Sequence, residues 1–205
     1  MNKQVIQEDY RTAGVKSVRD VLLLGVDAGE KCLRETITDI TDEECHWEPL
    51  PPAERAADRL LPPHQKQVWR VFQQEGVWVY DYTPEVLKLP PFTTIAWIMI
   101  HIAQTADMYL NCIKTGKPEG LERRWDDLPV PSSCLAMSRY IFEELTEVRN
   151  YLVSIPTEQI QHELNKLTPA PWGEMRPTYL NVWGGVIEHG IQHAMQIALR
   201  KDRIR

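Results

Sequence analysis

The distribution of proline constrains the fold more than any other feature of this sequence. Eight of the 15 prolines lie between Pro49 and Pro91. Proline inside a helix removes a backbone hydrogen bond and costs about 3 kcal/mol, so long helices are expected where proline is absent. The windows without proline are residues 1–48, 92–117, 132–155 and 178–205.

Each proline-free window carries apolar residues at helical spacing. Steps of three and four residues place side chains on one face of a helix. The stripes comprise Val18, Leu22, Val26, Leu33, Ile37 and Ile40; Ile95, Ile98, Ile102, Ala106, Tyr109 and Ile113; Ile141, Leu145, Val148, Leu152 and Ile155; and Val182, Val186, His189 or Gly190, His193, Ile197 and Arg200. Four long helices in a chain of 205 residues predict an all-α fold, a four-helix bundle, in one domain over residues 1–205.

Start signals support these helices. Thr93 or Thr94 is a suitable N-cap for the helix of the second window, and PSS (131–133) precedes that of the third. TDEE (41–44) has the form of a capping box, because its threonine and its last glutamate can each bond to the other's backbone. It predicts one extra turn of helix after the first long helix.

The segment 46–92 is too long for a simple connection between the first two helices of a compact bundle. It contains Trp47, Trp69 and Trp78, and VWVYDY (77–82) has the composition of a short strand. We expect this proline- and tryptophan-rich insertion to be partly ordered and to lie over one end of the bundle. A lid or pocket wall and an inert surface insertion or dimer contact are both compatible with it.

The overall composition excludes several classes of protein. Hydrophobic residues make up 43% of the chain and charged residues 25%, as in ordinary globular proteins. The formal net charge is −6 and no long basic run is present, which argues against a nucleic-acid-binding protein. No apolar run approaches the roughly 20 residues that a membrane-spanning helix needs.

The N-terminal stretch and the cysteines indicate the compartment. MNKQVIQEDYRTAG lacks the charged and then apolar layout of a signal peptide. The cysteines have no metal-binding spacing and are interpreted as reduced thiols in a cytoplasmic protein. They are Cys32, Cys45, Cys112 and Cys134.

Two histidines in EHGIQHAMQIALR (188–200) are four residues apart. On a helix, His189 and His193 lie on one face, close enough to share one metal ion. The zinc-protease motif has glutamate directly after the first histidine, whereas this chain has Gly190 there. Glu188 precedes the pair and, on an α-helix, points about 100° away from the ligand face. The protease interpretation therefore fails.

A third ligand must come from another helix. His101, in the middle of IAWIMIHIAQTADMY, lies beside the apolar stripe of the second window and can point inward. Three neutral imidazoles would form an open-sided site for a divalent transition metal such as zinc, nickel or iron, which these ligands do not distinguish. Each histidine can also be an ordinary, satisfied side chain of a helix.

Other polar and aromatic residues surround these positions. Candidate pocket residues, or residues that orient a ligand, are Trp97, Gln104, Asp107, Gln196 and Arg200. Trp97 and Tyr109 also suit the core, and Arg200 can be either an anion-binding group or a cation at a helix end.

The remaining histidines and the glycines are ambiguous in the same way. His46, His64 and His162 are most simply surface residues, although His46 or His64 could line a pocket. Gly184, Gly185 and Gly190 indicate either the close approach of a neighbouring helix or room for a ligand.

Three stretches of the chain resemble the DinB-like superfamily. HGIQHAMQIALR resembles the closing helix of that family, in which the spaced histidine pair precedes a small residue, a glutamine, an apolar stretch and an arginine. TIAWIMIHIAQTADMY resembles its second helix, and TDEECHWEPLPP its loop after the first helix. Met195 departs from the glycine that is common before this glutamine. The resemblance implies a four-helix bundle in which His101, His189 and His193 form a metal triad.

The resemblance also implies a class of chemistry. Members include transferases that use low-molecular-weight thiols such as bacillithiol or mycothiol, so it implies a small-molecule substrate and a thiol cosubstrate activated by a metal. Hydrolysis by metal-activated water needs the same ligands. A non-catalytic helical binding or stress protein, with a structural metal or none, is the alternative. A homodimer is expected.

Overall fold

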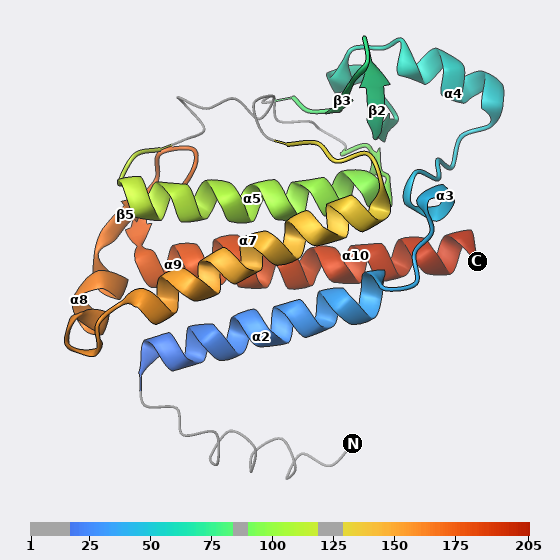
Figure 1. Cartoon of the computed structure of the whole chain (residues 1–205). Helices are drawn as coiled ribbons and strands as arrows, with labels where there is room; N and C mark the ends of the chain where they lie inside the picture. The colour runs from blue at the N-terminus through green and yellow to red at the C-terminus, as the bar shows by residue number, and fades with distance from the viewer. Residues whose placement is uncertain (1–16, 84–89, 119–128) are drawn as a thin grey trace.

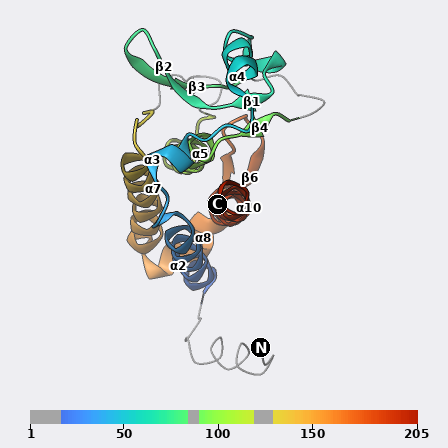
Figure 2. The same cartoon turned by 90° about the vertical axis from the view of Figure 1, so that its right-hand side faces the viewer.

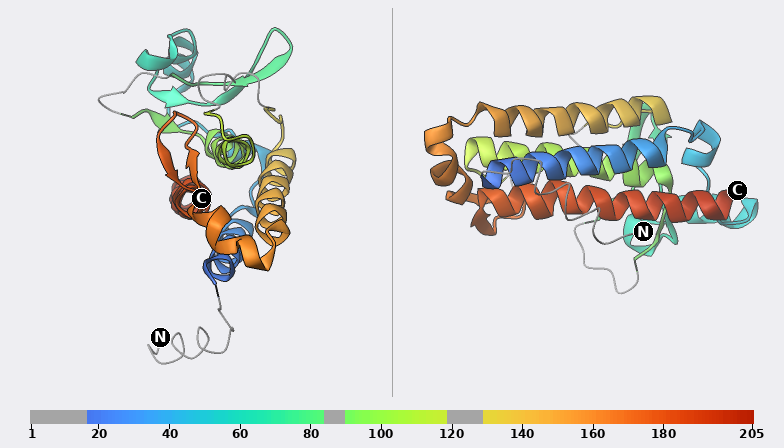
Figure 3. Two further views of the ribbon diagram at one scale, coloured as in Figure 1. Left: turned by 90° about the vertical axis from the view of Figure 1, so that its left-hand side faces the viewer. Right: turned by 90° about the horizontal axis from the view of Figure 1, so that it is seen from below.

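Long helices dominate the computed structural model, which describes residues 17–83, 90–118 and 129–205. Helices α2 (Val18–Ile37), α5 (Ile95–Thr115) and α7 (Cys134–Ser154) lie beside a C-terminal helical run (Figures 1 and 3). This run comprises α9 (Thr178–Val182), the π-helical segment η4 (Trp183–Glu188) and α10 (His189–Ile204). The prediction of a mostly helical fold is confirmed. The part of the first predicted helix window before residue 17 lies outside the described residues.

Helices α3, α5 and α7 begin where the sequence predicts. The Thr94 hydroxyl accepts a hydrogen bond from the backbone N–H of Trp97 and caps α5, and Ser133 caps α7 in the same way. Thr41 and Glu44 form both bonds of a capping box at the start of the single-turn helix α3 (Asp42–Cys45). These bonds satisfy N–H groups that have no partner within the helix, which stabilises each helix start.

The predicted apolar faces meet between the helices and form the core. All predicted residues of the stripes on α5 and α7 are buried, as are those of α2 from Leu22 onward. Val18 is the exception, because 50% of it is exposed. Val18 is the first residue of α2 and, together with Ile160 and Tyr179, lines a cavity of about 860 Å³. Its side chain therefore remains partly exposed.

The described part of the segment between α3 and α5 folds into short helices and strands. It contains α4 (Pro52–Arg59), the 3₁₀ turn η1 (Pro63–Gln65), β1 (Val68–Trp69), β2 (Val71–Gln74), β3 (Val77–Tyr80) and β4 (Phe92–Thr93). Strands β2 and β3 form an antiparallel hairpin, which confirms the predicted strand in VWVYDY, and β1 pairs with β4 in parallel. The segment lies beside the first turns of α5 (Figures 1 and 2).

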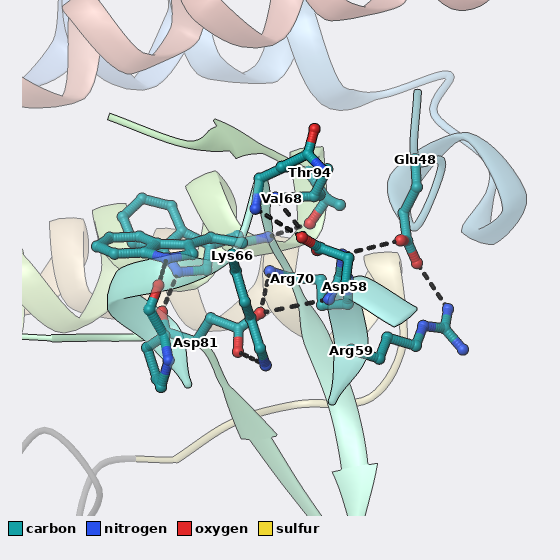
Figure 4. Close-up of polar contacts among 12 residues, drawn as sticks. Glu48, Asp58, Arg59, Lys66, Val68, Arg70, Asp81 and Thr94 are labelled. Atoms are coloured by element: carbon teal, nitrogen blue, oxygen red, sulfur yellow. Dashed lines mark hydrogen bonds and ion pairs between the residues drawn. The ribbon is translucent and has the colours of Figure 1, made fainter. Parts of the chain in front are cut away.

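A buried charge cluster, formed by Glu48, Asp58, Lys66, Arg70 and Asp81, holds this segment together (Figure 4). Asp58 accepts a hydrogen bond of 2.6 Å from the Arg70 guanidinium, and Lys66 Nζ lies 2.5 Å from an oxygen of Asp81. Glu48 lies 3.1 Å from Arg70. Burial raises the pKa of Asp81, and the Lys66 ammonium opposes that rise. Pairing thus compensates charges that would be costly to bury alone.

A third two-stranded sheet among the described residues supports the C-terminal helical run. After the 3₁₀ turn η3 (Thr157–Gln159) and α8 (Ile160–Asn165), strands β5 (Leu167–Pro169) and β6 (Met175–Pro177) pair in antiparallel fashion. The buried amide of Asn181 donates a hydrogen bond of 3.0 Å to the Thr168 carbonyl and fastens α9 to this hairpin. Among the described residues, none of the helices combines the length and apolar character that crossing a bilayer requires.

Candidate metal centre

Two packed helices bring together the three histidines that the sequence singles out. His101 lies in the second turn of α5, and His189 and His193 lie one turn apart at the start of α10, which packs against α5. His189 Nε2 lies 3.2 Å from His101 Nε2 and 3.0 Å from His193 Nε2. The ring nitrogens that converge all lie within 4.8 Å of one another. The three imidazoles therefore point at a common centre.

The spacing of these nitrogens fits a transition metal. Zinc–nitrogen bonds of about 2.0–2.1 Å place two nitrogens of one ion about 2.9–3.4 Å apart, depending on the coordination angle. The distances of 3.0 and 3.2 Å between the ring nitrogens fall within this interval. Imidazole nitrogens are ligands for zinc, nickel and iron alike, so the donor set fits a divalent transition metal without selecting one.

The protonation state of the histidines also suits metal binding. Burial lowers the pKa of His101 well below its ordinary value of 6.5, and the two neighbouring imidazoles add to the effect. Burial, followed by the influence of His193, lowers the pKa of His189 from 6.5 to about 3. Burial lowers the pKa of His193 as well, although Gln196 opposes this. All three rings are therefore neutral at pH 7, the form that binds metal.

Gln196 fixes the tautomer of His193. Its Oε1 lies 2.9 Å from His193 Nδ1. An amide oxygen only accepts hydrogen bonds, so Nδ1 carries the proton and Nε2 keeps its lone pair for the common centre. Gln196, a candidate from the sequence, thus contacts one of the three histidines.

Trp97 connects His101 to the segment between α3 and α5. Its indole stacks on the His101 ring, with ring centroids 4.8 Å apart and an interplanar angle of 23°. The indole N–H donates a hydrogen bond of 2.6 Å to the Asp81 carbonyl. Asp81 is itself held by Lys66 and by the backbone N–H of Arg70. The buried charge cluster therefore supports the aromatic ring that covers His101.

A cavity of about 460 Å³ adjoins the histidine cluster. It is lined by His101, Thr105, Tyr109, Pro171, Trp172, Arg176, Gly184, Gly185, Glu188, His189 and Gln192. It is large enough for a small organic molecule. Its aromatic, cationic and anionic side chains meet the cluster on the side of His101 and His189.

Two glycines of η4 shape this cavity. A Cβ on Gly185 would lie 2.4 Å from the Tyr109 ring, so the absence of a side chain lets η4 approach α5 closely. A Cβ on Gly184 would meet nothing within 4 Å, which leaves open space in the cavity wall. The close approach of a neighbouring helix thus explains Gly185, whereas room for a ligand beside Gly184 stays a prediction.

Glu188 lines the cavity beside His189. Its carboxylate accepts a hydrogen bond of 3.2 Å from Gln192 Nε2, so it shares a helix face with Gln192. That face lies about 100° from the one that His189 and His193 share. Arg176, on β6, also lines the cavity and was not predicted, because its sequence neighbours show no helical or catalytic pattern.

Two other predicted pocket residues form hydrogen bonds away from the histidine cluster. The side-chain amide of Gln104 is buried and donates a hydrogen bond of 3.2 Å to the Pro129 carbonyl. Arg200 donates a hydrogen bond of 3.3 Å to the Thr93 carbonyl and stacks 4.0 Å from the centre of the Phe92 ring. Both side chains fasten neighbouring segments, and neither lines the cavity beside the histidines.

The remaining polar candidates lie apart from the cluster. His46 packs near Trp78 and lines a separate cavity of about 460 Å³ in the segment between α3 and α5. His64 and His162 are exposed, as expected for surface residues. Asp107 faces Glu144 of α7; burial first, and then the charge of Asp107, raises the pKa of Glu144 to about 7.

The lowered histidine pKa values predict an acid-sensitive fold. The unfolded chain takes up protons at its histidines near pH 6.5, whereas His189 in the folded metal-free protein does so near pH 3. Its contribution to stability is complete above pH 6.5 and is lost as pH falls through this window. Urea unfolding in the presence of a chelator should show a shallower pH dependence for His189→Leu than for wild type. Equal slopes would contradict the assignment of a buried, neutral imidazole.

Helices that present three neutral, converging imidazoles beside a cavity define a helical protein with a candidate metal centre. The chain belongs to the DinB superfamily, whose family model matches residues 26–197. A solved structure that is similar in fold is that of a conserved protein from Enterococcus faecalis, with a TM-score of 0.53 and 16% sequence identity. The match covers 91% of this chain and 96% of that chain. No curated protein matches the sequence.

Proposed function

We propose that the protein is a metal-dependent enzyme in which His101, His189 and His193 hold a divalent transition metal. In this proposal α2, α5, α7 and the run from α9 to α10 form a DinB-like four-helix bundle in a single domain. Residues 46–92 are then a long insertion whose buried charge cluster positions Trp97 against the site. The cavity beside the histidines receives a small-molecule substrate.

The observation that carries the proposal is the contact among the Nε2 atoms. His189 Nε2 lies within 3.2 Å of both other Nε2 atoms. Each neutral ring has one proton, and Gln196 holds that of His193 on Nδ1. Lone pairs that face one another at this distance repel unless a proton or a cation lies between them. A metal ion would satisfy all three nitrogens at once.

A bound divalent metal would supply Lewis acidity, which lowers the pKa of a coordinated thiol or water. The residues of the chain perform the remaining tasks. Gln196 holds one imidazole in the tautomer that can bind metal, and Trp97 shields another from water. Tyr109 and Arg176 offer a hydroxyl and a guanidinium to a substrate in the cavity. Burial raises the pKa of Tyr109 to about 12, so its hydroxyl stays protonated and can donate.

Activation of a low-molecular-weight thiol, as in an S-transferase, is the first candidate. The thiol itself supplies the nucleophile, so the site needs metal ligands and a substrate pocket but no carboxylate base. Hydrolysis is a second candidate, and a specific observation favours it. Glu188 lines the same cavity as His101 and His189 and offers a carboxylate that can accept a proton from water.

Cobalt substitution tests the proposal. The metal-free protein reconstituted with Co(II) should develop visible d–d absorption bands, and His193→Ala should not. Addition of 2-mercaptoethanol should then produce a sulfur-to-cobalt charge-transfer band, because the three histidines leave coordination positions open. Ethylene glycol, which has an oxygen in place of the sulfur, is the matched control and should produce no such band.

The outcomes separate the two candidates. Cobalt bands that the thiol leaves unchanged would reject thiol activation and favour hydrolysis with Glu188 as the base. In that case Glu188→Gln should lower ester hydrolysis by about 100-fold or more. Identical spectra for wild type and His193→Ala would reject the metal centre itself. The cytoplasmic location and the homodimer remain predictions.

A further inference from the structure

Cys45 and Cys134 meet in a sulfur cluster away from the histidines. Cys45 ends α3 and Cys134 begins α7, and both thiols contact the thioether of Met99 on α5. The Cys45 and Cys134 sulfurs lie 3.8 and 4.0 Å from Met99 Sδ, respectively. Residues 89 positions apart in the sequence thus place two free thiols against the same Met99 sulfur.

Several bonds hold the two thiols in this arrangement. The Cys134 backbone N–H donates a hydrogen bond of 2.6 Å to Asp42 Oδ1, which joins α3 to α7. The capping box fixes the other side of α3, where Glu44 also accepts a hydrogen bond of 2.7 Å from Arg205. The bond between Asp42 and the Cys134 backbone thus joins α3 to the start of α7, and the bond between Glu44 and Arg205 joins α3 to the end of α10.

The two thiols differ in acidity. The influence of the neighbouring thiol lowers the pKa of the Cys134 thiol, whereas the same influence together with burial raises the pKa of Cys45. Cys134 also occupies the first residue of a 21-residue helix, where the backbone dipoles stabilise a thiolate. It is 5% exposed, whereas Cys45 is fully buried. Cys134 is thus the more nucleophilic and the more accessible sulfur, and Cys45 is placed to react with it.

We infer that Cys45 and Cys134 form a peroxide-reactive dithiol that closes to a disulfide. The Cys134 thiolate attacks one oxygen of hydrogen peroxide, the O–O bond breaks, and water leaves with the second oxygen and a proton. The sulfenic acid on Cys134 is then attacked by the Cys45 sulfur, which forms the S–S bond and releases a second water. Two thiols lose two electrons and two protons, and one peroxide is reduced to two waters.

Closure would link two parts of the molecule that are otherwise held by hydrogen bonds. Cys45 directly precedes the segment that carries the buried charge cluster and supports Trp97. The disulfide would fix the beginning of this segment to α7 and restrict the unfolded chain by a long loop. The oxidised protein should therefore melt at a higher temperature than the reduced protein. The inference does not depend on the histidine centre.

Peptide mapping after limited oxidation tests the inference. Metal-free protein with all four cysteines reduced is treated with one equivalent of hydrogen peroxide, and a chelator prevents metal-catalysed oxidation. Wild type should lose two hydrogen atoms and yield a linked pair of peptides that contain Cys45 and Cys134. Cys45→Ser should stop at the sulfenic acid, which dimedone traps on Cys134. Cys134→Ser should form neither product. Cys32→Ser, which removes the partly exposed thiol of α2, should behave as wild type.

Other product distributions would overturn the inference. Preferential oxidation of Cys32, with Cys45 and Cys134 still reduced, would show that exposure alone decides reactivity. Dimedone labelling of Cys45 in Cys134→Ser as fast as that of Cys134 in Cys45→Ser would show that Cys134 is not the preferred nucleophile. Should a serine variant fail to fold, alkylation of native wild type with iodoacetamide decides the order. Cys134 should react before Cys45, and the reverse order would contradict the proposed roles.

Discussion

Replacing His189 with alanine is expected to lower metal affinity by more than about 100-fold and to leave the purified protein with almost no metal. Loss of a group that merely orients a ligand costs about 10–100-fold in affinity, so loss of a ligand must cost more. His189 should show the largest effect of the three, because its Nε2 lies within 3.2 Å of both other ring nitrogens. Metal content by elemental analysis and affinity by competition with a chromophoric chelator measure the change.

Two further variants make this experiment decisive. His162 is an exposed histidine on α8, with 81% of its side chain accessible, so His162→Ala should retain the metal content of wild type. Gln196→Leu removes the acceptor for His193 Nδ1 but leaves every imidazole in place. Its affinity should fall between those of wild type and His189→Ala, by about 10-fold. Equal metal content in wild type, His189→Ala and His162→Ala would contradict the proposal that the three histidines bind a metal.

Replacing Asp58 with alanine is expected to destabilise the protein by about 3–5 kcal/mol, since it leaves a buried cation without its main partner. Asp58 is 2% exposed and lies 2.6 Å from the Arg70 guanidinium, which has 3% of its side chain exposed. It also accepts a hydrogen bond of 2.6 Å from the backbone N–H of Gln67. Chemical denaturation followed by circular dichroism and tryptophan fluorescence measures the loss.

The matched control is a surface ion pair. Lys31 and Glu35 lie 3.9 Å apart on α2 with 77% and 68% of their side chains exposed. Glu35→Gln should change stability by less than about 1 kcal/mol, because solvent screens such pairs. A similar loss for both variants would mean that the charge cluster contributes no more than a surface pair. A fluorescence transition that precedes the helical one would localise the damage to the segment with Trp47, Trp69 and Trp78.

The long helices were predictable because their determinants are local. Proline-free windows, apolar stripes and capping residues act within a few turns, and Thr94, Ser133 and the Thr41–Glu44 box cap the helices as expected. The short strands were harder to predict from the sequence. Strands β5 and β6 each span three residues, and contacts with Asn181 and Thr178 secure them. Their stability depends on tertiary contacts, which no short sequence pattern reports.

The candidate site could be predicted only in part, for the same reason. His189 and His193 share a face because of their spacing, and His101 was identified from its place in a second helix and from family resemblance. Arg176 reaches the cavity through the β5–β6 hairpin, and Glu188 lines it together with Gln192, one turn further along the helix. The association of Trp97 with Asp81 requires a contact between distant segments. Sequence spacing therefore indicated the histidines, whereas the other residues that line the cavity are brought together only by the tertiary fold.

The π-helical turn at Trp183–Glu188 lets one continuous run of helix serve two surfaces. A turn with one additional residue offsets the angular phase of everything that follows by roughly one residue, about 100°. The residues before the turn face the hairpin through Asn181, and those after it face α5 through His189 and His193. An uninterrupted α-helix would have to sacrifice one of these orientations. The π-helical turn thus allows Asn181 to bind the hairpin while His189 and His193 face α5.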